Sequence, residues 1–152
     1  MMTKLRVALR RLLRTREDGS MSIELVALAP VFALLILFLI AVGRIALAGD
    51  AAQAAANAAA REASLSRTTA EAQQDANAAA QASMAQSGYS CNTLTVNIDD
   101  SGLNVPLGQV GTVSSTITCT LNLSDIALPG LPGSWTMERD ASSPVDAYRE
   151  RP

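Results

Sequence analysis

The sequence has no histidine, only two cysteines and only five aromatic residues among its 152 residues. Without histidine, a zinc site would need Cys91, Cys119 and two carboxylates, and the side chain that most often acts as general base is missing. So few aromatic side chains leave the chain to pack mainly with alanine and aliphatic residues, which argues against a large ligand-binding core. We therefore expect no metal, no cofactor and no small-molecule substrate.

Catalytic motifs are absent as well. Serine and aspartate residues are scattered without the spacing of a nucleophile elbow, a metal site or a phosphate-binding loop. The pair Asp99-Asp100 precedes Ser-Gly, so we expect a solvated turn there and not a carboxylate pair or a calcium site. The sequence predicts a structural subunit and not an enzyme.

Positive charge is concentrated at the N-terminus. Six basic residues and no acidic residue precede residue 17, whereas from Ser20 onward six basic residues face twelve acidic ones, a net charge of −6. This acidic balance argues against a nucleic-acid-binding surface in the larger part. The basic residues of the first segment, taken as a cytoplasmic leader over residues 1–19, are Lys4, Arg6, Arg10, Arg11, Arg14 and Arg16.

An uncharged apolar run of 19 residues, Leu25 to Gly43, follows the leader. A helix of this length extends about 28 Å, close to the thickness of a bilayer's hydrocarbon core, so residues 20–45 are predicted to form a transmembrane helix. The six basic residues before it and Arg44 alone near its end place the N-terminus in the cytoplasm and the C-terminus outside. Pro30 lies inside the run and is expected to kink the helix.

Residues 46–88 read as an alanine-rich helical stalk. Between residues 46 and 85, 19 of 40 residues are alanine, a composition that strongly favours helix. Thr68 and Glu71 have the spacing of a capping box, so a break and a new helix start are expected there, and Gly88 is expected to end the helix. A narrow stripe of mostly small residues suits close helix packing: Leu47, Ala51, Ala55, Ala58, Glu62 and Leu65.

Beyond residue 88 the period of the pattern becomes two. Apolar and polar residues alternate over 93–98 and again over 113–123, which predicts two antiparallel strands, and 135–139 is predicted as a third short strand after a loop at 128–133. Residues 89–140 thus form a small β-containing region, and 141–152 a polar tail. The expected fold class is α+β: a transmembrane helix, a helical stalk and a small antiparallel β element.

The two cysteines are expected to form a disulfide in an extracytoplasmic region; the alternative is two unrelated free thiols. Cys119 falls on the apolar side of its strand, whereas Cys91 falls on the polar side of the first strand. Cys91 must therefore precede the regular part of that strand if it is to reach Cys119.

The segment Glu17-Asp18-Gly19-Ser20-Met21-Ser22-Ile23-Glu24-Leu25 places a lone carboxylate at the start of the apolar run. One interpretation is an interfacial glutamate near a helix N-terminus. The other is that a leader ending at Gly19 is removed, which leaves Ser20 with a new, mostly protonated α-amino group. In apolar surroundings that amine needs a counter-charge, which Glu24 could supply within its own chain or to an adjacent subunit.

At Gly19, Ser20 to Ile23, Glu24 and Pro30, the chain resembles short-leader pilins and more closely the TadE-like minor pseudopilins of the tight-adherence (Flp-type) pilus system. The resemblance implies processing after Gly19 by a prepilin peptidase, assembly with other pilin or pseudopilin subunits, and a place in the cell membrane or a surface pilus. One departure is Leu25, where pilins of this system often have an aromatic residue.

Two other interpretations stay open. Ala46-Leu47-Ala48 before Gly49 fits a signal-peptide cleavage pattern, which would make the chain a secreted protein. Alternatively, the leader stays uncleaved and the chain is a single-pass membrane-anchored binding protein.

Overall fold

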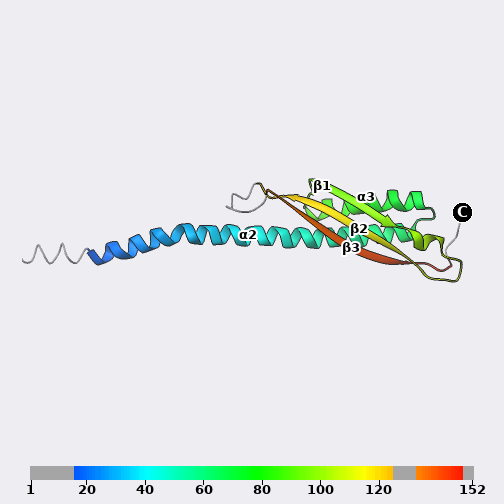
Figure 1. Cartoon of the computed structure of the whole chain (residues 1–152), viewed down its shortest axis with the longest axis horizontal. Coiled ribbons are helices and arrows are strands. Elements are labelled where there is room, and N and C mark those ends of the chain that lie inside the picture. Colours follow the sequence, from blue (N-terminus) through cyan, green and yellow to red (C-terminus); the bar gives the residue numbers. More distant parts are fainter. Residues whose placement is uncertain (1–15, 125–132, 149–152) are drawn as a thin grey trace, which may run out of the picture. The chain divides into compact units, whose positions relative to one another are not determined.

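The structure, a computed structural model, describes residues 16–124 and 133–148. Two helices are followed by a three-stranded sheet, which confirms the predicted α+β class (Figure 1). The chain divides into two compact units, residues 1–40 and residues 41–152, and each is described by itself. The elements are α2 (Arg16–Leu65), α3 (Thr69–Ser87), β1 (Thr93–Asp99), the short 3-10 helix η1 (Ser101–Asn104), β2 (Gly111–Asn122) and β3 (Ser134–Val145).

Helix α2 is a single helix of 50 residues. It includes the last residues of the predicted leader, the whole apolar run and the first part of the alanine-rich segment, with Pro30 inside it. Proline lacks the N–H that an interior helix position donates, but it does not end α2, and the predicted kink stays a prediction. Among the described helices, α2 alone is long and apolar enough to cross a membrane.

The break between the two helices lies where the sequence predicts it. Thr68 caps α3: its side chain accepts a hydrogen bond from the Glu71 N–H at 3.2 Å, and the Glu71 carboxylate accepts one from the Thr68 N–H at 3.3 Å. At the other end, Gly88 adopts the left-handed conformation with φ 73°. Both caps confirm the expected helix boundaries, because each satisfies main-chain groups that a helix end leaves without partners.

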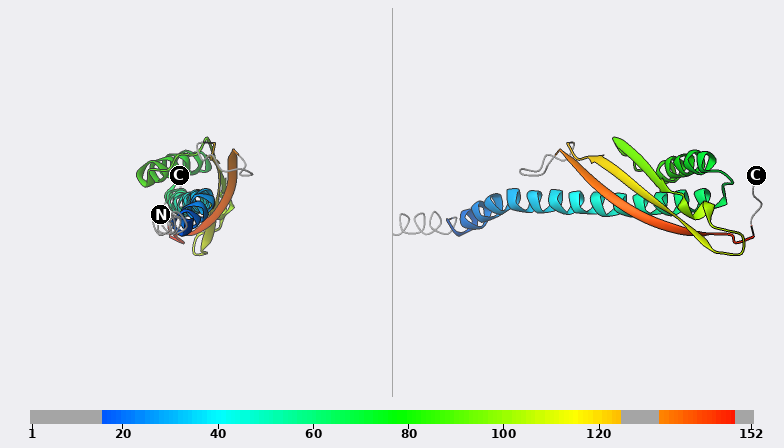
Figure 2. Two further views of the ribbon diagram at one scale, coloured as in Figure 1. Left: turned by 90° about the vertical axis from the view of Figure 1, so that its left-hand side faces the viewer. Right: turned by 45° about the vertical axis from the view of Figure 1, so that its right-hand side comes forward.

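The sheet has the order β1-β2-β3, and both pairings are antiparallel. Figure 2 shows the three strands lying across the helices as one twisted layer. The third strand is longer than predicted, since it runs from Ser134 to Val145 and takes in the first residues of the expected polar tail. β3 extends this far because all twelve residues of β2 pair with it, the last pair being Gly111 and Val145. Pro144 is tolerated because β3 is an edge strand.

The core of residues 41–152 joins one face of the sheet to alanine-lined helix faces. On β2, every second residue is buried, which is the pattern of a strand with one face covered. The stripe predicted on α2 is only partly right, because Leu47 and Leu65 are exposed. The buried helix residues in this core are Ala48, Ala51, Ala52, Ala55, Ala56, Ala59, Ala63, Ala72, Ala76, Ala80 and Met84.

Candidate functional site

The predicted processing cluster lies among the first described residues of α2. The main chain of Gly19, Ser20 and Glu24 belongs to the helix. The side chains of residues 1–25 and 27 lie outside the described part of the chain, and the carboxylate of Glu24 is among them. Cleavage after Gly19 and the pairing of Glu24 with an amine therefore stay predictions.

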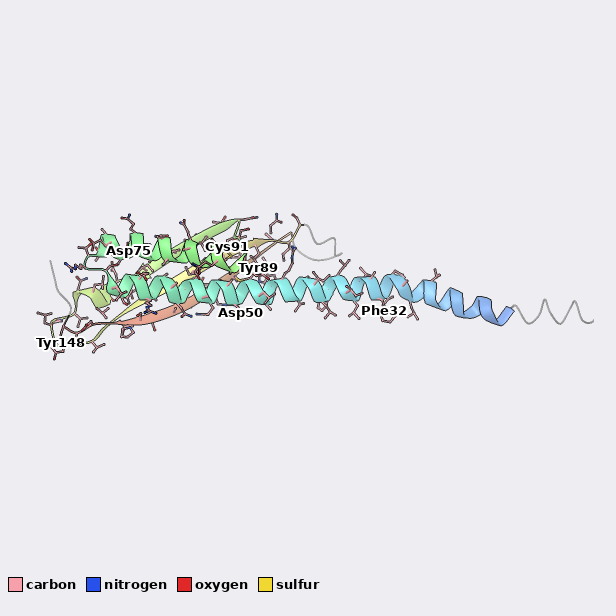
Figure 3. All side chains as sticks on the ribbon, turned by 180° about the vertical axis from the view of Figure 1, so that it is seen from behind. Phe32, Asp50, Asp75, Tyr89, Cys91 and Tyr148 are labelled. Carbon is pink, nitrogen blue, oxygen red and sulfur yellow. A yellow bond between two sulfur atoms is a disulfide. The ribbon has the colours of Figure 1, made fainter. Side chains whose placement is uncertain are left out.

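The apolar run presents hydrophobic side chains all round the helix. Exposed positions include the consecutive sets Leu34-Leu35-Ile36 and Phe38-Leu39-Ile40, and successive helix residues point about 100° apart. Figure 3 shows Phe32 projecting from this part of α2. A helix that is apolar on every side needs apolar surroundings, which a bilayer or a bundle of similar helices provides. The large exposed residues here are Val26, Leu28, Val31, Phe32, Leu34, Leu35, Ile36, Phe38, Leu39, Ile40 and Val42.

Within residues 41–152, the residue that follows β2 packs against the part of α2 where the apolar run ends. Leu123 is 2% exposed and contacts a small cluster with Ala41 and Ile45. Next to this cluster is a pocket of about 450 Å³. It is lined by Arg44, Ala48, Gly88, Tyr89, Ser90, Asn92, Leu121, Asn122 and Leu123. Arg44 is the only charged residue among these nine.

The disulfide between Cys91 and Cys119 is present, with 5.4 Å between the two Cα atoms. Cys91 precedes β1, as predicted, and the Cys119 side chain is fully buried in β2. The next residue, Asn92, donates a main-chain hydrogen bond of 2.7 Å to the Thr120 carbonyl oxygen. The disulfide and this bond hold the segment after α3 against the central strand, and with it Tyr89, which lies near Cys91 in Figure 3.

The acidic pair at the end of β1 forms a turn. The Asp99 carboxylate accepts a hydrogen bond of 3.1 Å from the Ser101 N–H, and Asp100 leads into η1. Hydrogen bonds from the side chain and the main chain of Ser101 hold the pKa of Asp99 below its ordinary value, because they favour the charged form. In the described part of the chain, no three or more cysteine or acidic side chains are grouped so that they could hold a metal ion.

Two contacts were not predicted from the sequence. The guanidinium of Arg139, on β3, lies over Gly49 of α2, where a Cβ atom would come within 2.9 Å of its Nη2 atom. Trp135 pairs with Leu121 in the β2–β3 register, on the side of the sheet that faces the helices, yet it is 45% exposed. The only sequence signal for either is the alternation within β3, which continues past the predicted third strand.

Comparison with known proteins supports the motif at the start of α2. Residues 19–61 match the family model described as TadE-like protein, so the matched segment begins at Gly19 and runs through the apolar part of α2. This match confirms the resemblance predicted from the sequence. Comparison with curated proteins and with solved structures gave no match.

Proposed function

We propose that this chain, a TadE-like protein by its residues 19–61, is a minor pseudopilin or assembly subunit of a Tad/Flp-type pilus. A prepilin peptidase removes the leader after Gly19, and the apolar helix then holds the chain in the membrane. The N-terminus is cytoplasmic before processing, and residues 46–152 are extracytoplasmic. The role is structural and not enzymatic.

The observation that carries this proposal is that the family match and the apolar surface coincide. The matched residues 19–61 include Val26 to Val42, where eleven large apolar side chains are between 45% and 72% exposed. Burying such side chains is favourable by about 1.5 to 3 kcal/mol each, which gives the helix a strong preference for a bilayer or for a bundle of subunits. A helix of this kind can serve first as an anchor and then as the packing element of a filament.

The main chain of Gly19 belongs to α2. A peptidase needs its substrate locally extended, so cleavage after Gly19 requires local opening of the helix at that position. Cleavage here makes Ser20 the first residue and leaves its amine close in sequence to the Glu24 carboxylate. We propose that Glu24 pairs with the amine of an adjacent subunit, because both charges would otherwise be costly in apolar surroundings.

Cleavage after Ala48, the secreted alternative, agrees less well with the structure. Ala48 is 1% exposed in the core and lies far inside α2, so a chain cut after it would lack the preceding part of that helix. The cut would also remove Ala41 and Ile45, the contacts of the buried Leu123. The loss of these contacts would destabilise the end of β2.

The test is the intact mass and N-terminal residue of the chain isolated from membranes of a cell that makes a prepilin peptidase. We expect a start at Ser20, with the apolar helix retained. A start at Gly49 would replace the proposal with a secreted protein, and an intact Met1 would leave an uncleaved membrane-anchored protein. Substituting Gly19 by a bulky residue is the matched control. It should block cleavage after Gly19 but leave cleavage after Ala48 unaffected.

A further inference from the structure

The base of the folded region lies where α2 leaves its apolar run. We call the basal surface the set Arg44, Leu47, Tyr89 and Trp135. Arg44 and Tyr89 line the same pocket, which also includes Leu121, and Trp135 pairs with Leu121 across the β2–β3 register. Residues from three separate parts of the chain therefore meet at the first charged position after the apolar run.

The basal surface combines exposed apolar side chains with a basic one. Trp135 is the chain's single tryptophan, and it is 45% exposed although its strand position faces the helices; Leu47 is 55% exposed. Tyr89 is half-buried. Tryptophan and tyrosine side chains, whose rings are apolar and whose N–H or O–H groups are polar, favour the boundary between hydrocarbon and water. Arginine at the same level reaches phosphate groups while its stem stays in apolar surroundings.

From these observations we infer that the basal surface rests on the headgroup layer of the bilayer, with a phospholipid phosphate at the Arg44 pocket. This inference rests on the proposed function, in which the preceding helix spans that bilayer. The pocket of about 450 Å³ offers room for a headgroup. Its polar side chains, Asn92, Asn122, Ser90 and Tyr89, can donate hydrogen bonds to phosphate oxygens, and the guanidinium of Arg44 adds a positive charge.

Two features keep the basal surface in position. The disulfide and the bond from the Asn92 N–H to Thr120 fix the segment that carries Tyr89 to β2. Leu123, packed on Ala41 and Ile45, fixes the end of β2 to α2. The surface therefore needs no folding step when it meets lipid, which lowers the entropic cost of binding.

Because Trp135 is the only tryptophan, its fluorescence reports directly on this contact. The full chain is reconstituted in nanodiscs of phosphatidylcholine that contain phosphatidylglycerol brominated near the headgroup end of one acyl chain, since bromine quenches tryptophan at short range. We expect Trp135 to be quenched and its emission shifted to shorter wavelength. In the control Trp135→Phe/Tyr148→Trp, the probe moves to an 84% exposed position after β3. Roughly equal quenching of the two proteins would overturn the inference.

The role of Arg44 is tested in the same system. One basic residue near an anionic surface contributes enough that Arg44→Gln should raise about fivefold the phosphatidylglycerol fraction needed for half-maximal quenching. Arg61→Gln, which removes an equal charge from an exposed position nearer the end of α2, should leave that fraction unchanged. Equal effects of the two variants would contradict a specific headgroup contact at the pocket.

Insertion of the helix is measured separately, by flotation of the same protein with vesicles. A chain that floats with vesicles but shows no preferential quenching of Trp135 would keep the proposed membrane role and refute the basal contact. A chain that does not float would refute both.

Discussion

The hydroxyl of Ser115, in the middle of β2, donates a hydrogen bond of 2.7 Å to the main-chain carbonyl oxygen of Ala56 in α2. Both residues are fully buried. A strand hydroxyl can reach a helix carbonyl in this way only because alanine side chains let the helix lie close to the sheet. Ser115 is therefore a buried polar residue that is satisfied, as such residues must be to avoid the cost of desolvation.

Replacing this serine tests the contact. Ser115→Ala should lower the free energy of unfolding by about 1 kcal/mol, because a net hydrogen bond is lost while the Ala56 carbonyl keeps its helix partner. Urea unfolding of the detergent-solubilised chain, followed by circular dichroism, measures the change. Ser114→Ala, at the exposed neighbouring position, is the control, and its change in the free energy of unfolding should be near zero. Comparable losses of stability in both variants would contradict the prediction.

The disulfide should contribute a large part of the stability of residues 41–152. Closing a loop across a sequence separation of 28 is worth about 3 to 4 kcal/mol on the chain-entropy estimate, so Cys91→Ser should lower the free energy of unfolding by that amount. Cys119→Ser should cost more, because it also places a hydroxyl in a fully buried position. Unfolding in urea, with and without reductant, measures both, and a larger loss from Cys91→Ser would refute this ordering.

Gly102 and Gly111 hold η1 against the start of β2 with main chain touching main chain. A Cβ atom on Gly102 would collide with the main chain of Thr112, and one on Gly111 with the main chain of Gly102. Gly102→Ala should therefore lower the free energy of unfolding by about 1 to 3 kcal/mol. Thermal unfolding measures this loss. Gly133→Ala, where a Cβ atom meets nothing within 4 Å, is the matched control in that assay. Equal melting temperatures for the Gly102→Ala and Gly133→Ala variants would show that η1 can move away from β2 without loss of stability.

The turn after β1 should make a small pH-dependent contribution. The pKa of Asp99 is lowered from 3.8 by its hydrogen bonds to Ser101, so the charged carboxylate favours the folded state. This contribution to stability is fully present when the pH is above the ordinary pKa of the unfolded chain. It is lost as the pH falls through the lowered pKa of the folded chain. Asp99→Asn should therefore be less stable than the parent chain near pH 6, with the difference shrinking as the pH falls below about 4.

A partial variant separates the two bonds of this turn. Ser101→Ala removes the side-chain hydrogen bond and keeps the N–H that donates to Asp99 at 3.1 Å, so its effect should be intermediate. Urea unfolding at several pH values measures all three proteins. A difference between Asp99→Asn and the parent chain that does not change with pH would contradict the prediction.

If Glu24 pairs with the amine of a neighbouring subunit, Glu24→Ala should reduce pilus assembly more than leader cleavage. The physical reason is the unpaired ammonium group that the variant leaves among apolar helices. Immunoblots of the processed chain and of sheared surface pili measure the two steps in the same cells. Glu24→Asp, which keeps the charge, should restore part of the assembly, and normal pili from Glu24→Ala would rule out the pairing.

Local features of the fold were readable from the sequence because each rests on a few adjacent residues. The capping box at Thr68 and Glu71, the helix end at Gly88 and the strand alternation of β2 are all short-range patterns. The placement of Cys91 before β1 also followed, since strand parity alone decided it. The length of β3 did not follow, because it depends on partners that β2 supplies from elsewhere in the sequence.

The candidate site also has one part that the sequence predicts and one part that it does not. The apolar run and the motif at Gly19 and Glu24 are contiguous, so the sequence identified them and the family match covers them. The basal surface could not be found in advance, because Arg44, Tyr89 and Trp135 are brought together by pairing and packing and by no shared motif. Neither Tyr89 nor Trp135 stands out in the sequence except by the rarity of aromatic residues.

The alanine face of α2 has a consequence for how the helix is positioned along its own axis. Its buried alanines recur at nearly every turn, so a slip of one turn, about 5.4 Å, would replace each alanine by another and leave the apolar contacts almost unchanged. The alanine contacts therefore hold α2 against the sheet without fixing one position along the helix axis. Specific contacts select the register, among them the hydrogen bonds from Ser115 to Ala56, between Ser64 and Ser143, and from Gln53 to the Asp140 carbonyl oxygen. The place of Gly49 beneath Arg139 acts in the same way.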